Sequence, residues 1–597
     1  MIEGFKSDFF ERLRRASAAE IAYRVRKKLT ARKIKARLAK GRSPFGIPSV
    51  DPGHIASLEP PVITVLSAEA PRLIADPEEI TRFEVKYRNT FFDAIHPGPT
   101  DPDIRSVWEP ARLQNATLLL LCPGKGPESR QAAKKTVLQW IQDNPFLRGP
   151  HYLSAMECGL RVPVFFYCLK RAPDVSTEER EVLCRAIYEH ASWIEKNLSL
   201  YASLGNHTVC ECVGLIFGGA VFRHHLEGRR WVEMGCRILD RELAHQVLSD
   251  GGPAEQSFSY HRFVLDLYWL ASDFLEKNRL HDFAGWKERL LKGEAFLLAF
   301  QGKDGLSPSI GDSDDGYAVA PGVAPLRGTA ETPQDWITTF PDSGYTIVRG
   351  SGGLILTFDH GPLGMPPLYN HGHADALAIT LSSEGKPILV DPGTFRYNGV
   401  PEWRRYFKGT RAHNTVTVDE QDQAVQETGF IWGKPYRAGL EKVAEGDRWV
   451  LLKGAHNGYE RLGSAVTHER TVFFEKDSSI LIKDSFKGKE DHDFELNFHL
   501  HPEAAVEESD GWIKVNIAGV EAFVRLLESG RFEVIRGREN PIHGWCSPAY
   551  GIKMPGPVLS SRVRMAAEET IFFTAVCLGE PCDVSALKSR FLDIANR

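Results

Sequence analysis

The residue types best suited to chemistry gather in segment 369–375, which holds two histidines two positions apart, His371 and His373. Asp391 follows a predicted hairpin further along the chain, and His413 stands in the sequence RAHNT. His373, Asp391 and His413 offer a nitrogen/oxygen/nitrogen donor set that suits a divalent cation. In an extended segment His371 and His373 would share a face, so the loop must separate them if only one binds metal. Two hydrogen-bonded loop histidines are the alternative interpretation.

Two further polar clusters precede predicted helices. Gly205, Asn206 and His207 lie between a helix that ends near residue 201 and one that begins near residue 208, where an asparagine can serve simply as a helix cap. The glycine-rich turn GGPAEQSFSY, residues 251–260, delivers Tyr260 to the start of another helix. A core tyrosine with a satisfied hydroxyl is the common structural alternative. Neither cluster identifies a reaction by itself.

Other motifs are weak or missing from the sequence. The run Gly124-Lys125-Gly126 lacks the ending and the strand–helix context of a phosphate-binding loop, and neither GxSxG nor HExxH occurs. The acidic run IGDSDDGY, which contains Asp312, could hold a cation or a sugar, but a turn is the simpler use of these residues.

Composition describes an ordinary globular protein of 597 residues, 42% hydrophobic and 25% charged. The net charge is −5, whereas a nucleic-acid coat protein would carry an excess of basic residues, so no nucleic-acid partner is expected. Residues 1–45, however, contain 14 Lys/Arg and 4 Asp/Glu. This basic arm predicts a surface helix whose charges are merely solvated, or one that contacts a membrane surface, a polyanion or a partner.

The sequence leaves the cellular location open. No run reaches the roughly 18 to 20 apolar residues that span a bilayer, and the first residues lack the apolar core of a signal peptide. We expect the protein to stay in the cytoplasm, to leave by another route for a periplasmic or secreted role, or to have lost a leader. The ten cysteines are scattered without a CxxC pair, which favours reduced, buried thiols over disulfides or a zinc ribbon.

The hydrophobic periodicity changes near residue 340. Before it, apolar residues such as Leu183 and Ile187 recur every three or four positions, which predicts amphipathic helices in antiparallel pairs. After it, the period falls to two in many short β-branched and aromatic runs, which predicts an antiparallel sandwich. We therefore predict a basic helical arm with a proline-rich connector at 1–75, a helical domain at 76–338 and a β domain at 339–597.

Three sets of motifs together resemble one known family. The segments NHGHADALAITLSSEGKPILVDPGTFRYNG and AHNTVTVD resemble the core motif of the heparinase II/III superfamily of polysaccharide lyases. GNH at 205–207 and EQSFSY at 255–260 resemble its two helical-domain motifs, in the right order. The likeness runs from about residue 80 to 590. It implies an incomplete (α/α) toroid followed by an antiparallel β-sandwich, in agreement with the change of period.

The resemblance also implies an activity, β-elimination at a uronic acid within a polysaccharide such as heparan, chondroitin, hyaluronan or alginate. It assigns Asn206, together with His207, to grip the carboxylate. Tyr260 would protonate the leaving oxygen and, for one configuration at C5, could also take the proton. His371 would act as the base from the other face of the sugar. Because a phenol with a pKa near about 10 is a poor base at neutral pH, Tyr260 would then need a positive neighbour.

Further assignments follow from the same resemblance. His373, Asp391 and His413 match the family's metal triad, and we expect zinc or manganese there in a structural role that pins the loop carrying His371. Arginines between the motifs could bind carboxylate or sulfate with a bidentate fork, and an aromatic ring could stack on a sugar. Solvated arginines and a core aromatic are the alternatives. The candidate substrate-binding residues are Glu255, Gln256, Arg404, Arg405, Arg411 and Trp545.

Two other functions compete with the lyase. A non-catalytic protein that binds polysaccharide or assists exopolysaccharide assembly would bind glycans without creating a double bond. A metal-dependent hydrolase would need His373, Asp391 and His413 to hold a metal with an open position. The joint presence of Asn206, Tyr260 and His371 counts against the non-catalytic protein.

Overall fold

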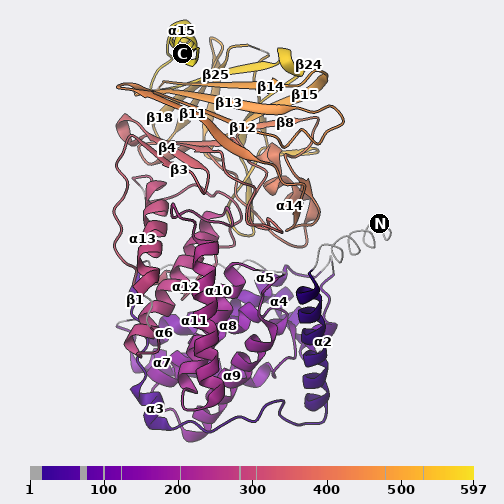
Figure 1. The fold of residues 1–597 in the computed structure, drawn as a ribbon, viewed down its shortest axis with the longest axis vertical. Helices are drawn as coiled ribbons and strands as arrows, with labels where there is room; N and C mark the ends of the chain where they lie inside the picture. Colours follow the sequence, from indigo (N-terminus) through magenta and orange to yellow (C-terminus); the bar gives the residue numbers. More distant parts are fainter. Residues whose placement is uncertain are drawn as a thin grey trace.

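The computed structural model describes residues 17–66, 77–98, 101–122, 124–201, 204–281, 284–303, 305–476, 479–528 and 530–596. Residues 1–16 of the predicted basic arm and 67–75 of the predicted connector lie outside the described residues. Figure 1 shows a helical N-terminal half stacked on a β-rich C-terminal half. Among the described residues, no helix combines the length and apolar character needed to cross a membrane.

Twelve of the described α-helices precede the β half, and local capping sets the ends of several of them. Ser176 and Glu179 form a reciprocal capping box at the start of α9, and Ser257 caps α12. In chain order the helices are α2 (Ala18–Ala39), α3 (Pro52–Ser57), α4 (Pro77–Tyr87), α5 (Ile104–Ala111), α6 (Gln114–Leu121), α7 (Pro127–Asp143), α8 (Ala155–Arg171), α9 (Thr177–Asn197), α10 (Asn206–Val221), α11 (Leu226–Gln246), α12 (Phe258–Lys277) and α13 (Ala284–Ala299), of which α3 is a single short turn of the connector.

Helix α10 is the centre of this half. It is buried along most of its length and packs against α8, α9, α11 and α12. Two glycines let α8 and α10 approach closely, since a Cβ on Gly214 would lie 2.7 Å from the Cα of Gly159. The resulting ring of antiparallel helices is the predicted incomplete (α/α) toroid.

The β half consists of three antiparallel sheets and smaller hairpins. The largest sheet has the order β11 (Ala438–Gly446), β12 (Trp449–His456), β13 (Thr467–Glu475), β14 (Ser479–Lys487), β25 (Ile571–Leu578), β18 (Val520–Leu526), β17 (Trp512–Ile517), β16 (Ala505–Ser509). The second contains β19 (Glu533–Arg536), β24 (Pro557–Ala566), β15 (Asp491–His499) and β8 (Val416–Val418). The third contains β3 (Ile337–Phe340), β4 (Tyr345–Arg349), β5 (Ile355–Asp359), β6 (Ile379–Ser383) and β7 (Lys386–Leu389).

Alternation along the strands builds the sandwich. In β14, Ile480 and Ile482 belong to the core shared by the three sheets, whereas Leu481 joins a separate cluster with Phe591 of α15 (Val584–Ala595). A period of two puts neighbouring side chains on opposite faces, so one strand serves both layers. The antiparallel sandwich predicted from the sequence is confirmed.

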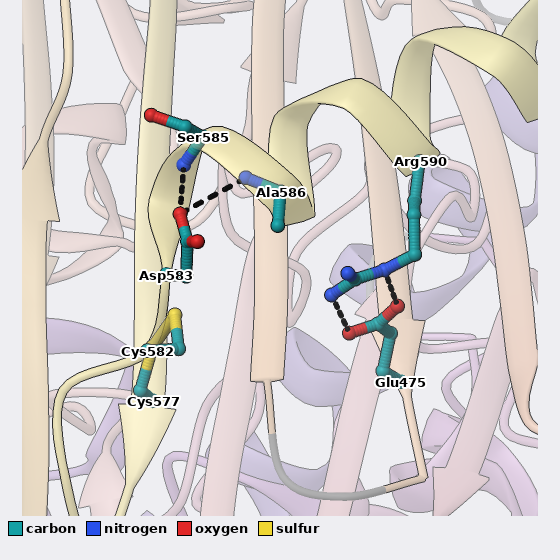
Figure 2. The surroundings of a disulfide bond; sticks show 7 residues. All are labelled: Glu475, Cys577, Cys582, Asp583, Ser585, Ala586 and Arg590. Carbon is teal, nitrogen blue, oxygen red and sulfur yellow. Dashed lines mark hydrogen bonds and ion pairs between the residues drawn. A yellow bond between two sulfur atoms is a disulfide. The ribbon is translucent and has the colours of Figure 1, made fainter.

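Helix α15 is fastened to the large sheet, as Figure 2 shows. Asp583 caps its start, and Arg590 makes two hydrogen bonds to Glu475 of β13, at 2.6 and 2.8 Å. Cys577 at the end of β25 forms a disulfide with Cys582. The expectation of reduced thiols is therefore wrong for this pair, because the turn after β25 brings the two together. The other eight cysteines are free and buried.

The two halves are joined by more than one segment. The connector contributes β1 (Ile63–Val65), which pairs with β2 (Val323–Pro325) in the stretch after the last toroid helix. The predicted boundary between residues 338 and 339 falls inside β3. Helix α14 (Pro401–Lys408) lies where the β half faces the toroid (Figure 1). The loop between β5 and β6 reaches the toroid through His371, which lies 3.3 Å from Asn206.

A buried ion pair inside the toroid yields a stability prediction. Arg112 donates two hydrogen bonds to Glu157, at 2.9 and 2.8 Å, and both side chains are buried. Burial alone would raise the pKa of Glu157, but the charge of Arg112 outweighs it and lowers the pKa. Glu157→Ala leaves a buried unpaired cation and should cost about 3–5 kcal/mol in the free energy of unfolding.

Urea unfolding followed by helical circular dichroism measures this loss. The control is Asp93→Ala, which breaks the exposed pair with Lys35 and should change the free energy by no more than about 1 kcal/mol. The contribution of Glu157 is present above its unfolded-state pKa and is lost as the pH falls through its lowered folded pKa. Equal effects of the two substitutions would contradict the prediction.

Candidate active site

Asn206 is the first residue of α10, and its side chain does not cap the helix. The preceding Gly205 has φ 130°, and a Cβ there would lie 1.8 Å from Glu255 Oε1, so only glycine fits. The Asn206 amide donates to the two carboxylate oxygens of Glu255 at 3.3 and 3.1 Å and lies 3.3 Å from His371 Nε2. Its side chain is therefore committed to a polar cluster and not to the helix terminus.

Tyr260 lies in the first turn of α12, where its N–H donates to the capping Ser257 at 3.2 Å. Its hydroxyl is 3.1 Å from the hydroxyl of Tyr397. Burial and the charge of Asp314 raise the pKa of Tyr260 well above its ordinary value, against the lowering effects of Tyr397 and Arg105. Arg105 is the positive neighbour that the sequence required, but the net result is a phenol that keeps its proton.

His371 comes from the loop between β5 and β6 and meets both side chains. Its ring centroid is 4.0 Å from that of Tyr260, and its Nε2 faces the Asn206 amide. Residues from α10, α12 and the β half thus converge. Because the two rings touch, no sugar can lie between them in this arrangement, and the expected placement of Tyr260 and His371 on opposite faces of one sugar is not observed.

Asp312 is the hub of the cluster. It follows α13, is fully buried, and accepts two hydrogen bonds from Arg404 at 2.5 and 2.8 Å. Its oxygens lie 3.2 Å from His371 Nδ1 and 3.0 Å from His373 Nε2. Burial alone would raise the pKa of Asp312, but the charge of Arg404 and the two imidazoles hold it well below its usual range. The interpretation of Asp312 as a simple turn residue did not foresee these contacts with Arg404, His371 and His373.

Asp312 also sets the state of His371. Burial would lower the pKa of His371, but the hydrogen bond to Asp312 and the charges of Glu255 and Asp312 raise it above 6.5. Contact of Nδ1 with a carboxylate favours a proton on that nitrogen, which leaves Nε2 as the acceptor when the ring is neutral. His207, which follows Asn206, has its pKa lowered to about 4, first by burial and then by the charge of His371.

His373, Asp391 and His413 also lie together, each with one ligand atom within 4.8 Å of the others. His413 Nδ1 is 2.9 Å from Asp391 Oδ2. Among the described residues, the buried His373 Nδ1 and His413 Nε2 have no hydrogen-bond partner. Two orphaned imidazole nitrogens beside a carboxylate are a donor set that a divalent cation would satisfy, so the residues fit the expected metal.

The pKa values of the two histidines in this triad shift in opposite directions. Burial lowers the pKa of His373 to about 4, which leaves a neutral imidazole of the kind that binds metal. It would lower the pKa of His413 as well, but the adjoining Asp391 raises it.

The predicted substrate-binding residues divide into several groups. Glu255 belongs to the cluster through Asn206. The side chain of Gln256 donates to Ser343 O at 3.0 Å and accepts from Tyr345 at 2.7 Å, which ties the turn to the β half. These bonds give Gln256 a structural position.

The arginines behave differently from one another. Arg404 is 1% exposed and its guanidinium is taken up by Asp312, so the expected substrate contact is incorrect for this residue. Arg411 makes two hydrogen bonds to Glu495, at 2.8 and 3.0 Å. Arg405 on α14 is exposed. The fork geometry expected for a substrate anion is used within the protein by Arg404 and Arg411.

The aromatic residues near the end of the chain are partly structural. The ring of Trp545 lies 3.8 Å from the Lys553 ammonium. Tyr550 donates to Asp103 Oδ2 at 2.6 Å and accepts from the N–H of Tyr397 at 3.0 Å. Tyr550 therefore helps to hold Tyr397, the residue whose hydroxyl contacts Tyr260.

Sequence reasoning missed the roles of four residues of this site, Tyr397, Asp312, Arg105 and Asp314. Tyr397 stands in the quoted run DPGTFRYNG and Asp312 in the acidic run, so both were within segments already of interest. Arg105 on α5 pairs with Asp314 at 3.1 Å, and no local pattern distinguishes it from other helical arginines. The sequence can identify such an arginine as buried and part of a site only when its distant partner is known.

The fold and the convergent cluster define a toroid–sandwich protein, and comparison with known sequences identifies its family. Residues 131–343 match the heparinase II/III N-terminus, and residues 333–571 match the heparinase II/III-like C-terminal domain. The chain belongs to the heparinase II/III-like family.

Two curated relatives are heparin-sulfate lyases. The one from Bacteroides stercoris is 23% identical over 440 residues, which cover 68% of this chain and 61% of the relative. The one from Pedobacter heparinus is 23% identical over 394 residues, which cover 60% and 55%. The chain thus spans less than two thirds of the length of these relatives.

Solved structures support the fold. A heparinase III structure has a TM-score of 0.65 at 15% identity and covers 92% of this chain and 91% of that one. A heparan sulfate lyase from Pedobacter heparinus has a TM-score of 0.57 at 17% identity and covers 96% and 91%. At these identities the likeness concerns the arrangement of toroid and sandwich.

The Asp312 contacts lead to a prediction about His371. In Asp312→Asn the hydrogen bond and one of the two anions that raise the pKa are gone, while burial, Glu255 and the cation of Arg404 remain, so the pKa of His371 should fall. Histidine-selective NMR titration, with the His371 signal assigned from His371→Gln, measures this shift. Asp315→Asn, outside this hub, should leave the pKa in place. An unchanged pKa in Asp312→Asn would show that Asp312 does not control the imidazole.

Proposed function

We propose that this protein is a polysaccharide lyase that cleaves a uronate-containing, anionic polysaccharide by β-elimination. The observation that carries the proposal is the convergence of the Asn206 amide, the Tyr260 phenol and the His371 imidazole at the toroid–sandwich junction. The heparin-sulfate lyase relatives support a glycosaminoglycan as the class of substrate.

The reaction first requires neutralisation of the uronate carboxylate. The C5 proton is weakly acidic because the adjacent carboxylate is already charged, and its removal builds an enolate-like dianion. Asn206, oriented by Glu255, is the donor for this carboxylate, and binding would exchange its contact with His371 for one with the substrate. His207 stands beside it. A donor aimed at developing charge typically contributes about 3–4 kcal/mol.

Proton transfer then divides between two groups. Neutral His371 takes the C5 proton on Nε2, while Asp312 holds the proton on Nδ1. The electron pair of the C5–H bond forms the C4–C5 double bond, the C4–O4 bond breaks, and Tyr260 protonates O4. A phenol whose pKa is raised stays protonated and suits the acid role, which argues against Tyr260 as the base. The raised pKa of His371 implies that activity increases with pH as this ring loses its proton.

The proposal includes a divalent metal, zinc or manganese, held by His373, Asp391 and His413. When bound, such an ion would fix the loop that carries His371, because His373 lies two positions further along the same loop. Asp312 contacts both histidines and would connect the two sites. Peripheral membrane contact through the basic arm stays a prediction, since none of the comparisons concerns it.

Tyr260→Phe tests the lyase assignment. Loss of the acid should reduce the rate by about 10²–10⁴-fold, because placed acids contribute by this factor. The measurement is the ultraviolet absorbance of the unsaturated product on heparan sulfate, chondroitin, hyaluronan and alginate. Tyr167→Phe, a buried tyrosine of α8 whose hydroxyl has no partner among the described residues, should retain activity. Full activity in Tyr260→Phe would refute the assignment, and glycan binding by the wild type without any double bond would favour the binding protein.

His413→Ala tests the metal. The wild type should contain about one zinc or manganese ion per chain by mass spectrometry, and the variant should lose it and melt at a lower temperature, since binding to the native state stabilises it. His501→Ala, a histidine outside the triad, serves as the control. A wild type that contains no metal, is fully active and melts at the same temperature as His413→Ala would contradict the structural role.

A further inference from the structure

A cavity with a volume of about 470 Å³ lies on the toroid side of the cluster. Its walls come from α2, α5, the start of α8, the end of α9 and the stretch 198–201. His207 lines it too, and the preceding residue Asn206 contacts His371. The cavity is therefore next to the proposed reaction centre, and its size is in the range of ordinary ligand pockets.

The charges in this cavity have one sign. The cations that line it are Arg24 and Lys27, whereas the lowered pKa of His207 leaves that ring neutral. No acidic side chain lines the cavity among the described lining residues. Helix α2 carries eight basic residues and only one acidic residue, Glu20, which pairs with Arg24. The nearby Glu211 is buried and hydrogen-bonded to Ser199, and burial raises its pKa to about 7. The cavity thus presents cations that are not matched by anions on its own walls.

The remaining walls suit a sugar. Trp108, Tyr152, Trp193 and Tyr201 line the cavity. Aromatic rings offer apolar surface for the C–H faces of a pyranose together with polar edges for its hydroxyls. Among the described residues, the buried Nε1–H of Trp193 has no acceptor. A cavity with cations, aromatic rings and a spare donor matches an anionic saccharide better than a lipid chain or a protein.

Helix α2 is built into this wall. Tyr23 donates to Leu198 O at 2.7 Å, and Lys27 donates to Asn197 O at 2.9 Å. Tyr23 also packs on Tyr201, with ring centroids 5.5 Å apart. In Figure 1 the helix runs along the outer side of the toroid. These contacts tie the described part of the basic arm to the segment that leads to Asn206.

We propose that α2 and this cavity form an extended subsite that binds anionic sugar units of the chain adjoining the unit that is cleaved. The inference rests on the proposed lyase function for its site of action. Arg24 is the key residue, because its side chain is more than half exposed and can turn from Glu20 to a carboxylate or sulfate. Lys27 and Tyr23 position the helix.

Arg24→Glu tests the subsite, with Arg32→Glu as the matched control. Arg32 is an exposed residue of the same helix that does not line the cavity. On polymeric substrate, Arg24→Glu should raise KM by about 5- to 10-fold with kcat little changed, because it reverses a charge that binds but does not react. On the shortest oligosaccharide that is still cleaved, the two variants should behave alike, since that substrate does not extend into the cavity.

The increase in KM should shrink at high salt, where exposed charges are screened. An effect of Arg32→Glu as large as that of Arg24→Glu on the polymer would overturn the subsite in favour of a diffuse basic surface. Equal loss of binding to phosphatidylglycerol vesicles in both variants, with no change in KM, would also overturn it and assign the arm to membranes.

Binding measurements separate this inference from the proposed reaction. If the wild type cleaves no polysaccharide, the lyase proposal fails, and calorimetric titration with heparan sulfate and alginate still tests the cavity. Weaker binding in Arg24→Glu than in Arg32→Glu would then support the subsite alone. Equal affinities in the two variants would refute it, whether or not the protein is a lyase. Unchanged melting temperatures confirm that both variants are folded.

Discussion

The site depends on one buried carboxylate. Asp312 has no access to water, and a buried charge is tolerated only when it is paired and hydrogen-bonded. Arg404 supplies the opposite charge, and His371 and His373 occupy the remaining directions. Since Asp312 follows the last toroid helix while its partners belong to the β half, this ion pair is satisfied only when the two halves are docked. The constraint that stabilises the junction therefore also positions the imidazole.

The same contacts assign a proton to each reacting group. Burial raises the pKa of Tyr260, so the phenol holds a proton to give. Asp312 is kept ionised by Arg404 and retains the Nδ1 proton of His371, which leaves Nε2 as the acceptor. Environments that push two pKa values apart are a general way to separate an acid from a base. Here the separation arises from packing at the junction, which no short motif contains.

This origin explains how much the sequence could predict. The change of period near residue 340 gave the helical and β halves, because burial on one face imposes a repeat that is readable locally. The motifs around Asn206, Tyr260 and His371 were recognisable by resemblance. Arg404 was misjudged as a substrate ligand, because its partner Asp312 lies 92 positions away and looked like a turn residue. The bond between Cys577 and Cys582 was missed for a different reason, since the two are only five positions apart but their spacing matches no motif.

The position of the basic cavity follows from the same electrostatic logic. A cation beside His371 would lower its pKa and oppose Asp312, as Arg404 already does in part. A lyase for an anionic polymer nevertheless needs cations to hold its substrate. Placing them on α2, beyond His207, lets Arg24 attract neighbouring anionic units without entering the hydrogen-bonded cluster. Attraction of the polymer and control of the proton are then carried by different residues, so the strength of one can change without altering the other.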